Sequence, residues 1–109
     1  MHRMTILYGR PTDPAAFDAY YRDVHLPIAS AMTGLTGWTL TWTRDQTGSL
    51  DEPIHLVVDL YAESRAAMDE VLASEAGQAA SADVPRFATG GVTFLRGTEE
   101  VVPLEGGPA

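Results

Sequence analysis

The sequence predicts an α+β domain in which two helices cover one face of a four-stranded antiparallel β-sheet. The chain has 109 residues, a length that suits one compact domain. Hydrophobic residues make up 45% and charged residues 20%, which are ordinary values for a globular protein. Strand-like and helix-like patterns follow one another in the order β-α-β-β-α-β, and this order predicts the fold class.

Short local patterns predict the first strand and the start of the first helix. The run Met4–Tyr8 is rich in residues that favour strands, and Gly9 begins the turn that ends it. Asp13 and Pro14 predict a helix start, because the carboxylate accepts free backbone N–H groups and proline fits the first helical position. Six residues at helical spacing form one apolar stripe: Phe17, Tyr20, Tyr21, Val24, Ile28 and Met32.

A proline is expected to divide this helix. Pro27 has no N–H to donate, and its ring crowds the preceding turn. We therefore expect two helical pieces, over residues 14–24 and 27–32, with His25 at the joint between them. Gly34 is expected to end the second piece, since glycine readily adopts the left-handed conformation that closes helices.

Two strands follow, separated by a loop. Residues 35–43 alternate threonine with large apolar side chains, which predicts a strand whose apolar face carries Trp38, Leu40 and Trp42. Residues 44–53 contain Asp, Gly, Ser and Pro and predict a loop. Residues 55–61 predict the next strand, with Leu56, Val58 and Leu60 on one face and His55, Val57, Asp59 and Tyr61 on the other.

A second helix and a last strand complete the pattern. Ser64 predicts the helix start, and the helix carries an apolar stripe of Ala67, Met68, Val71 and Leu72. The alanine-rich segment Ser74–Asp83 is expected to continue as a helix that is broken past Gly77. Val92–Leu95 predicts the last strand.

This order of elements is that of the ferredoxin-like fold, in which both helices lie on one face of the sheet. The other face would be uncovered, and the strands carry apolar or aromatic residues on much of both faces, so we expect an interaction surface. We predict a homodimer, a dimeric α/β barrel whose two sheets close over a shared cavity. The domain is expected to span residues 1–97. Residues 98–109 form an acidic tail rich in proline and glycine, expected to be mobile unless a partner holds it.

Two segments of the chain match the pattern of a known family. The segment Phe17–Pro27 ends in Tyr-Tyr-x-x-x-His-x-Pro, and the segment Ser74–Ala79 is followed by Asp83 and Phe87 before the last strand. On these motifs, nearly the whole chain resembles the EthD family, small proteins of the dimeric α/β-barrel superfamily. Named relatives include proteins of undefined role in ether degradation and proteins similar to muconolactone isomerases, polyketide cyclases and quinone-forming monooxygenases. The resemblance therefore implies the fold and the dimeric barrel but not one reaction.

The composition argues against several classes of partner. The net charge is −8, from 15 acidic residues against 7 arginines, with no lysine. Such a surface would repel nucleic acid and an anionic membrane. No apolar run approaches the ~20 residues that span a bilayer, and no signal peptide is recognisable. The sequence has no cysteine, so neither a disulfide nor a thiolate metal site is expected. We expect a cytoplasmic protein.

His25 is the leading candidate for chemistry. Imidazole titrates near pH ~6.5 and can take or give a proton at neutral pH. In an apolar cavity it could move a proton on a carbonyl, enol or lactone, and the resemblance implies a role because the family motif centres on this position. The alternative is a structural histidine whose ring bonds a backbone carbonyl left free by Pro27.

His55 and Asp59 are candidates for a second polar pair. They are four residues apart and are expected on one face of the same strand, which could be the cavity side. Alternatively, His55 lies in solvent at the strand end and Asp59 pairs with an arginine. An unpaired buried carboxylate is costly, so Asp59 is either functional or paired.

Aromatic residues are candidates to line a pocket for a flat apolar ligand. They are Tyr8, Tyr21, Trp38, Trp42 and Tyr61. For any single one of them, packing in the core or in the dimer is the competing interpretation. No metal site is predicted, because the three histidines are far apart in the sequence and cysteine is absent. No cofactor is predicted, although related barrels can bind haem through one histidine.

The sequence therefore favours a cofactor-free enzyme that acts on a small hydrophobic carbonyl, aromatic or lactone compound by proton transfer. The reaction would be an isomerisation, a cyclisation or a degradation. His25 would be the general acid/base, with Asp59 or His55 assisting. Two alternatives stay open: a protein that binds a hydrophobic metabolite without chemistry, and an oxygen-using or haem-binding monooxygenase.

Overall fold

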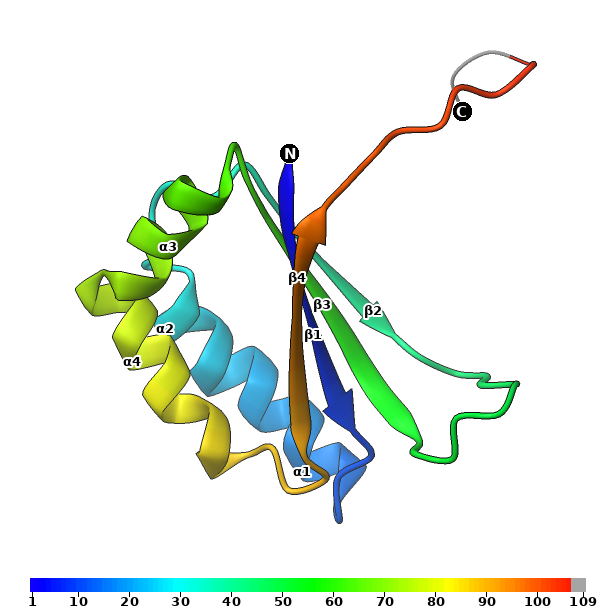
Figure 1. Cartoon of the computed structure of the whole chain (residues 1–109). Helices are drawn as coiled ribbons and strands as arrows, with labels where there is room; N and C mark the ends of the chain where they lie inside the picture. Colours follow the sequence, from blue (N-terminus) through cyan, green and yellow to red (C-terminus); the bar gives the residue numbers. More distant parts are fainter. Residues whose placement is uncertain (107–109) are drawn as a thin grey trace.

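The computed structural model describes residues 1–106 and contains one antiparallel sheet with the strand order β2-β3-β1-β4. The strands are β1 (His2–Gly9), β2 (Gly37–Trp42), β3 (Ile54–Ala62) and β4 (Val92–Thr98). The helices of the described residues lie on one face of the sheet, and the other face is open (Figure 1). This is the ferredoxin-like α+β arrangement, so the predicted fold class is confirmed. The last part of the predicted tail, residues 107–109, lies outside the described residues.

The first helical arm has three parts: α1 (Pro14–Tyr20), the π-helical turn η1 (Tyr21–His25) and α2 (Leu26–Ala29). Asp13 caps the arm as predicted, with its carboxylate accepting a backbone N–H of the first turn at 3.1 Å. The arm ends earlier than predicted. Gly34, with a φ of +98°, then allows a left-handed turn before β2.

Pro27 does not break this arm, and the predicted division at His25 is wrong. The N–H of Leu26 donates to the carbonyl of Tyr21, five residues back, so the helix is widened just before the proline. A wider turn relieves the crowding that proline causes in a regular α-helix. The helix therefore continues through Pro27, and η1 buries Tyr21 and His25, two residues of the motif, against the core.

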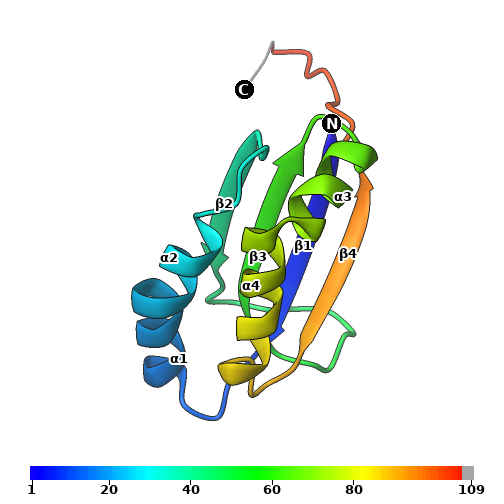
Figure 2. The same cartoon turned by 90° about the vertical axis from the view of Figure 1, so that its left-hand side faces the viewer.

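The second helical arm contains α3 (Arg65–Ala73), α4 (Glu75–Asp83) and the short 3-10 turn η2 (Val84–Arg86). Ser64 caps α3 as predicted, with its hydroxyl accepting a backbone N–H at 3.1 Å. Figure 2 shows that the two arms lie side by side over the sheet, and α2 contacts α4. The candidate site forms between these two arms and the sheet.

The break in the second arm lies at Ser74, not past Gly77 as predicted. The Ser74 hydroxyl donates to the carbonyl of Val71 at 2.5 Å and accepts the N–H of Gly77 at 3.1 Å. One side chain thus ends α3 and begins α4. Gly77 has a different role, because a Cβ there would collide with the carbonyl oxygens of Val71 and Leu72. Its missing side chain lets α4 pack closely against the end of α3.

The covered face of the sheet forms the hydrophobic core with the helices. Its buried side chains come from β1 and β3 and are Met4, Ile6, Tyr8, Leu56, Val58, Leu60 and Ala62. The apolar residues of β2 pair with this part of β3 and pack against the same core. Four aromatic rings with centroids 5.3 to 6.0 Å from one another meet at its centre: Tyr8, Phe17, Tyr21 and Phe87.

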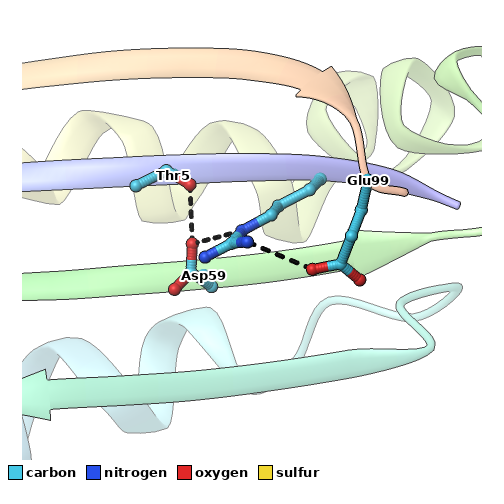
Figure 3. Close-up of polar contacts among 4 residues, drawn as sticks. Thr5, Asp59 and Glu99 are labelled. Carbon is cyan, nitrogen blue, oxygen red and sulfur yellow. Dashed lines mark hydrogen bonds and ion pairs between the residues drawn. The ribbon is translucent and has the colours of Figure 1, made fainter. Parts of the chain in front are cut away.

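The open face of the sheet is less apolar than predicted, because the tryptophans of β2 face the helices. Figure 3 shows a polar cluster on this face, in which Asp59 Oδ1 accepts hydrogen bonds from Arg3 Nε at 2.8 Å and from the Thr5 hydroxyl at 2.6 Å. Arg3 also pairs with Glu99 at 3.1 Å. Leu95 on the outer strand β4 is 50% exposed. The face is therefore a mixture of apolar side chains and internally neutralised charges.

Candidate active site

A cavity of about 50 Å³ lies between the helical arms and the covered face of the sheet. Its wall is largely apolar, and its large polar-tipped side chains are Tyr8, Tyr21, His25 and Trp38. The lining residues identified within the described chain include no Asp, Glu, Lys or Arg. Such a volume holds only a few water molecules. The sequence prediction placed the histidine in a hollow between two sheets; the structure instead places it within one protomer, under the helices.

His25 is held by Asp83, which lies 58 residues further along the chain. Nδ1 of His25, at the end of η1, is 3.0 Å from Oδ2 of Asp83, at the end of α4. The two residues are only 5% and 4% exposed. The other carboxylate oxygen accepts the hydroxyl hydrogen of Tyr20 at 2.7 Å. The imidazole packs between Phe87 and Tyr21, with ring centroids at 4.7 and 5.1 Å.

The protonation of this pair follows from its surroundings. Burial lowers the pKa of His25, and this effect outweighs the Asp83 carboxylate, which raises it. Burial alone would raise the pKa of Asp83. The hydrogen bonds from Tyr20 and His25, together with the positive charge of Arg86, lower it overall. At neutral pH the pair is therefore a neutral imidazole beside a carboxylate.

The tautomer of His25 is determined by its partner. An ionised carboxylate can only accept hydrogen bonds, so Nδ1 carries the proton and Nε2 keeps its lone pair. Among residues 1–106, Nε2 has no hydrogen-bond partner, while the ring lines the cavity. The site therefore presents the unprotonated Nε2 to an apolar cavity, while the buried carboxylate of Asp83 holds Nδ1.

Hydrogen-bond donors line the same cavity. The indole Nε1 of Trp38 is buried without a partner, and within residues 1–106 it is the one such side-chain atom. Burial raises the pKa of Tyr8 and of Tyr21, so both hydroxyls stay protonated. The Trp38 N–H lies near the Tyr21 oxygen and offsets this rise in part, but the two groups do not meet the geometry of a hydrogen bond, so Nε1 stays unpaired. An unpaired buried donor costs about 1–3 kcal/mol, which a ligand or a water molecule would recover.

Four of the predicted site residues meet at this cavity: His25, Tyr8, Tyr21 and Trp38. Trp42 lies on the same face of β2 but outside the cavity wall. The guanidinium of Arg22 lies 4.7 Å from the centre of its ring, so Trp42 is engaged in a cation–π contact near the surface.

Asp59 and Tyr61 lie on the opposite face of the sheet from His25. Hydrogen bonds from Arg3 and Thr5, together with the positive charge of Arg3, lower the pKa of Asp59 although burial opposes them. The Arg3 guanidinium is also 5.7 Å from the centre of the Tyr61 ring. The structure does not bring Asp59 to His25, and the alternative interpretation, in which Asp59 pairs with an arginine, is correct.

His55 does not share a face with Asp59, because β3 has a β-bulge at this point. The register between β1 and β3 shifts between Tyr8 and Gly9, which leaves His55 as an extra residue on β3. Its ring is turned to the helix side, where Nε2 lies 2.7 Å from the carboxylate of Asp18. His55 is therefore paired with α1 outside the cavity wall, and the predicted polar pair does not form.

Asp83 is the site residue to which sequence reasoning assigned no role. It ends an alanine-rich helix, and no local pattern connects it with a histidine 58 residues earlier. The one available signal is its place in the second segment that resembles the family pattern. In the described part of the chain, no group of three or more His, Cys, Asp or Glu residues could hold a metal ion. No helix there is long and apolar enough to cross a membrane.

The fold is that of small ferredoxin-like α+β proteins, and in this chain it holds a histidine between the helices and the sheet. The sequence profile described as EthD domain matches residues 9–91. This match covers well over half of the chain. The chain therefore belongs to the EthD family, as the resemblance implied.

Individual proteins are similar to this chain over nearly its whole length. The chain is 39% identical over 105 residues to an uncharacterised 11.0 kDa protein in the thcB-thcC intergenic region of Rhodococcus erythropolis, over 94% of this chain and 98% of that protein. An EthD family protein from Bacillus halodurans is 25% identical, with a TM-score of 0.79 over 92% of this chain and 99% of that chain. SnoaB, a cofactor-independent oxygenase from Streptomyces nogalater, has a TM-score of 0.58 at 14% identity over 93% of each chain. The likeness to SnoaB concerns the fold alone.

Proposed function

We propose that this EthD family protein is an enzyme that transfers a proton on a small hydrophobic carbonyl, aromatic or lactone compound. Nε2 of His25 is the general base and, once protonated, the general acid. The observation that carries the proposal is the 3.0 Å contact of Nδ1 with buried Asp83, which leaves Nε2 free in a ring that lines an apolar cavity. Proton transfer of this kind would drive an isomerisation, a cyclisation or a degradation.

Each residue of the pair has a distinct role in this proposal. Asp83 is a positioning residue, because it fixes the orientation and the tautomer of the imidazole without touching the substrate. When Nε2 takes a proton, the imidazolium that forms is stabilised by the adjacent carboxylate. The hydrogen bond from Tyr20, at 2.7 Å, favours the charged form of Asp83 throughout.

A second copy of the chain is the proposed partner for the open face of the sheet. Half-exposed Leu95 and the internally paired cluster of Arg3 and Asp59 give this face apolar area without an unpaired buried charge. A homodimer should appear as twice the chain mass in light scattering, and Leu95→Asp should shift the protein toward the monomer. A monomeric wild type at micromolar concentration would contradict this part of the proposal.

Deuterium exchange tests the proposed proton transfer. The probes are β-tetralone, a cyclic ketone fused to a benzene ring, and α-angelica lactone, each with an acidic C–H whose exchange in deuterium oxide is followed by proton NMR. The wild type should accelerate exchange of at least one probe, and His25→Gln should lower that rate by about 10²–10⁴-fold, the usual contribution of a general base.

A matched control separates chemistry from folding. His2 is also a buried histidine, but it lies at the start of β1, outside the cavity wall, where it contacts Arg96, and His2→Gln should keep the exchange rate. A His25→Gln protein that exchanges as fast as the wild type would refute the role of His25. A wild type that binds both probes without exchanging either would instead support a binding protein without chemistry.

A further inference from the structure

The cavity contains a buried hydrogen-bond donor that has no partner. Trp38 Nε1 is buried and unpaired, and the hydroxyl of Tyr21 stays protonated beside it. Trp38 comes from β2 and Tyr21 from η1, so the two donors reach the cavity from the sheet and from the helical arm. The free lone pair of His25 is a base and takes a proton rather than holding a ligand oxygen. An acceptor oxygen on a ligand would satisfy the Trp38 N–H.

The charge of the cavity wall restricts what that ligand can be. Since the identified lining residues of the described chain include no Arg or Lys, a carboxylate or phosphate would enter without a cation to pair with, which is costly in an apolar space. The net charge of −8 also repels anions on approach. The cavity therefore excludes preformed anions while its donors favour an oxygen that becomes negative inside.

We propose that the cavity takes a neutral phenol or enolisable ketone, and that the Trp38 indole N–H and the Tyr21 hydroxyl bind the oxygen of its conjugate anion. This inference rests on the proposed function and names its substrate class. In the step, the O–H or α-C–H bond of the substrate breaks and the proton goes to Nε2 of His25. The electron pair stays on the substrate, and its negative charge resides on the oxygen held by the two donors. The imidazolium and the anion form together, so the cavity gains no net charge.

Three coloured probes of similar size test this inference without any turnover. They are para-nitrophenol, a neutral acid with a yellow anion; para-nitroanisole, which has no acidic proton; and para-nitrobenzoate, a preformed anion. The apparent pKa of bound para-nitrophenol is read from the absorbance of its anion across a pH series. The wild type should bind para-nitrophenol and para-nitroanisole, and should bind para-nitrobenzoate at least tenfold more weakly than para-nitrophenol.

Removal of the indole N–H should weaken only the binding of the anionic form of the probe. Trp38→Phe should raise the apparent pKa of bound para-nitrophenol by about one unit, a roughly tenfold loss of the anionic form, because a hydrogen bond to a charged group is lost. The affinity for para-nitroanisole should stay within about twofold, since that ligand forms no anion. Trp38→Phe also removes part of the ring system and can disturb packing. Replacement of Trp38 by benzothienylalanine, which keeps the shape of the ring system without an N–H, should give the same pKa shift.

Trp42→Phe is the matched control, because it makes the same chemical change on the same face of β2 outside the cavity wall. It should leave the apparent pKa of the bound probe unchanged. The inference is overturned if neither change at Trp38 shifts that pKa, if para-nitroanisole loses affinity equally, if para-nitrobenzoate binds as well as para-nitrophenol, or if para-nitrophenol does not bind. Each of these results is independent of deuterium exchange in His25→Gln, so a failure of the anion site and a failure of the proposed base can be told apart.

Discussion

Replacement of Asp83 by asparagine tests the mechanism at the residue that does not touch the substrate. Asp83 accepts two hydrogen bonds, from His25 at 3.0 Å and from Tyr20 at 2.7 Å. An asparagine has only one acceptor oxygen. When that oxygen accepts from Tyr20, the amide N–H₂ faces Nδ1 of His25 and donates to it. Nδ1 then becomes the acceptor and the ring proton moves to Nε2, where a base is needed.

The magnitude follows from these two contacts. Deuterium exchange should fall by about 10²–10⁴-fold in Asp83→Asn, because the imidazole is held in the unproductive tautomer. The free energy of unfolding should fall by only about 1–2 kcal/mol, since both contacts can be remade as neutral hydrogen bonds. Activity and stability are therefore expected to separate, and chemical denaturation beside the exchange assay measures both.

Asp69→Asn is the matched control for this variant. Asp69 also has a basic side chain as its partner, Arg96 at 2.8 Å, but its own side chain is 55% exposed. Loss of such a surface pair costs about 0–1 kcal/mol and should leave exchange unchanged. An Asp83→Asn protein that exchanges at the wild-type rate would refute the reasoning, because the tautomer of His25 would then have no bearing on the reaction.

Two further predictions concern pH and the opposite face of the sheet. Asp59→Asn should keep deuterium exchange and lower the free energy of unfolding at pH 7 by about 1–3 kcal/mol. Because the folded-state pKa of Asp59 is lowered from 3.8, the stability that its carboxylate contributes is present above that value and is lost as the pH falls further. The free energies of unfolding of the wild type and of Asp59→Asn, measured by urea titration, should therefore converge in acid. A difference that stays constant with pH would contradict this prediction. Burial lowers the folded-state pKa of His25 from 6.5, so the unfolded chain takes up that proton first and the wild type should lose stability as the pH falls below about 6.5. His25→Gln should remove this part of the pH dependence, and an identical slope in both proteins would argue against a neutral buried imidazole.

Local chemistry in the sequence predicted the elements of the fold well. Asp13 and Ser64 start helices because their side chains cap free N–H groups, and this depends on a few neighbouring residues only. Alternation along β2 showed that the tryptophans share a face, but not which face, because that depends on the helices that pack against it. Pro27 predicted a break, yet a π-helical turn absorbs the proline, a choice that single-residue propensities do not determine.

The candidate site could be predicted only in part. His25 stands in a recognisable motif, whereas its partner Asp83 is brought to it by the packing of α4 against the first arm, over 58 residues of chain. The alternation rule placed His55 beside Asp59, and one extra residue in β3 was enough to turn His55 to the helix side. Long-range packing and register shifts thus account for the errors.

The tautomer of His25 at neutral pH tests the central claim most directly. Nitrogen-15 NMR of the imidazole side chain distinguishes a neutral ring protonated at Nδ1 from one protonated at Nε2 and from the imidazolium. The carboxylate of Asp83 at 3.0 Å and the burial of the ring predict a neutral ring with its proton on Nδ1 and a free lone pair on Nε2. A ring that carries its proton on Nε2 at pH 7, or that is already an imidazolium there, would contradict the account.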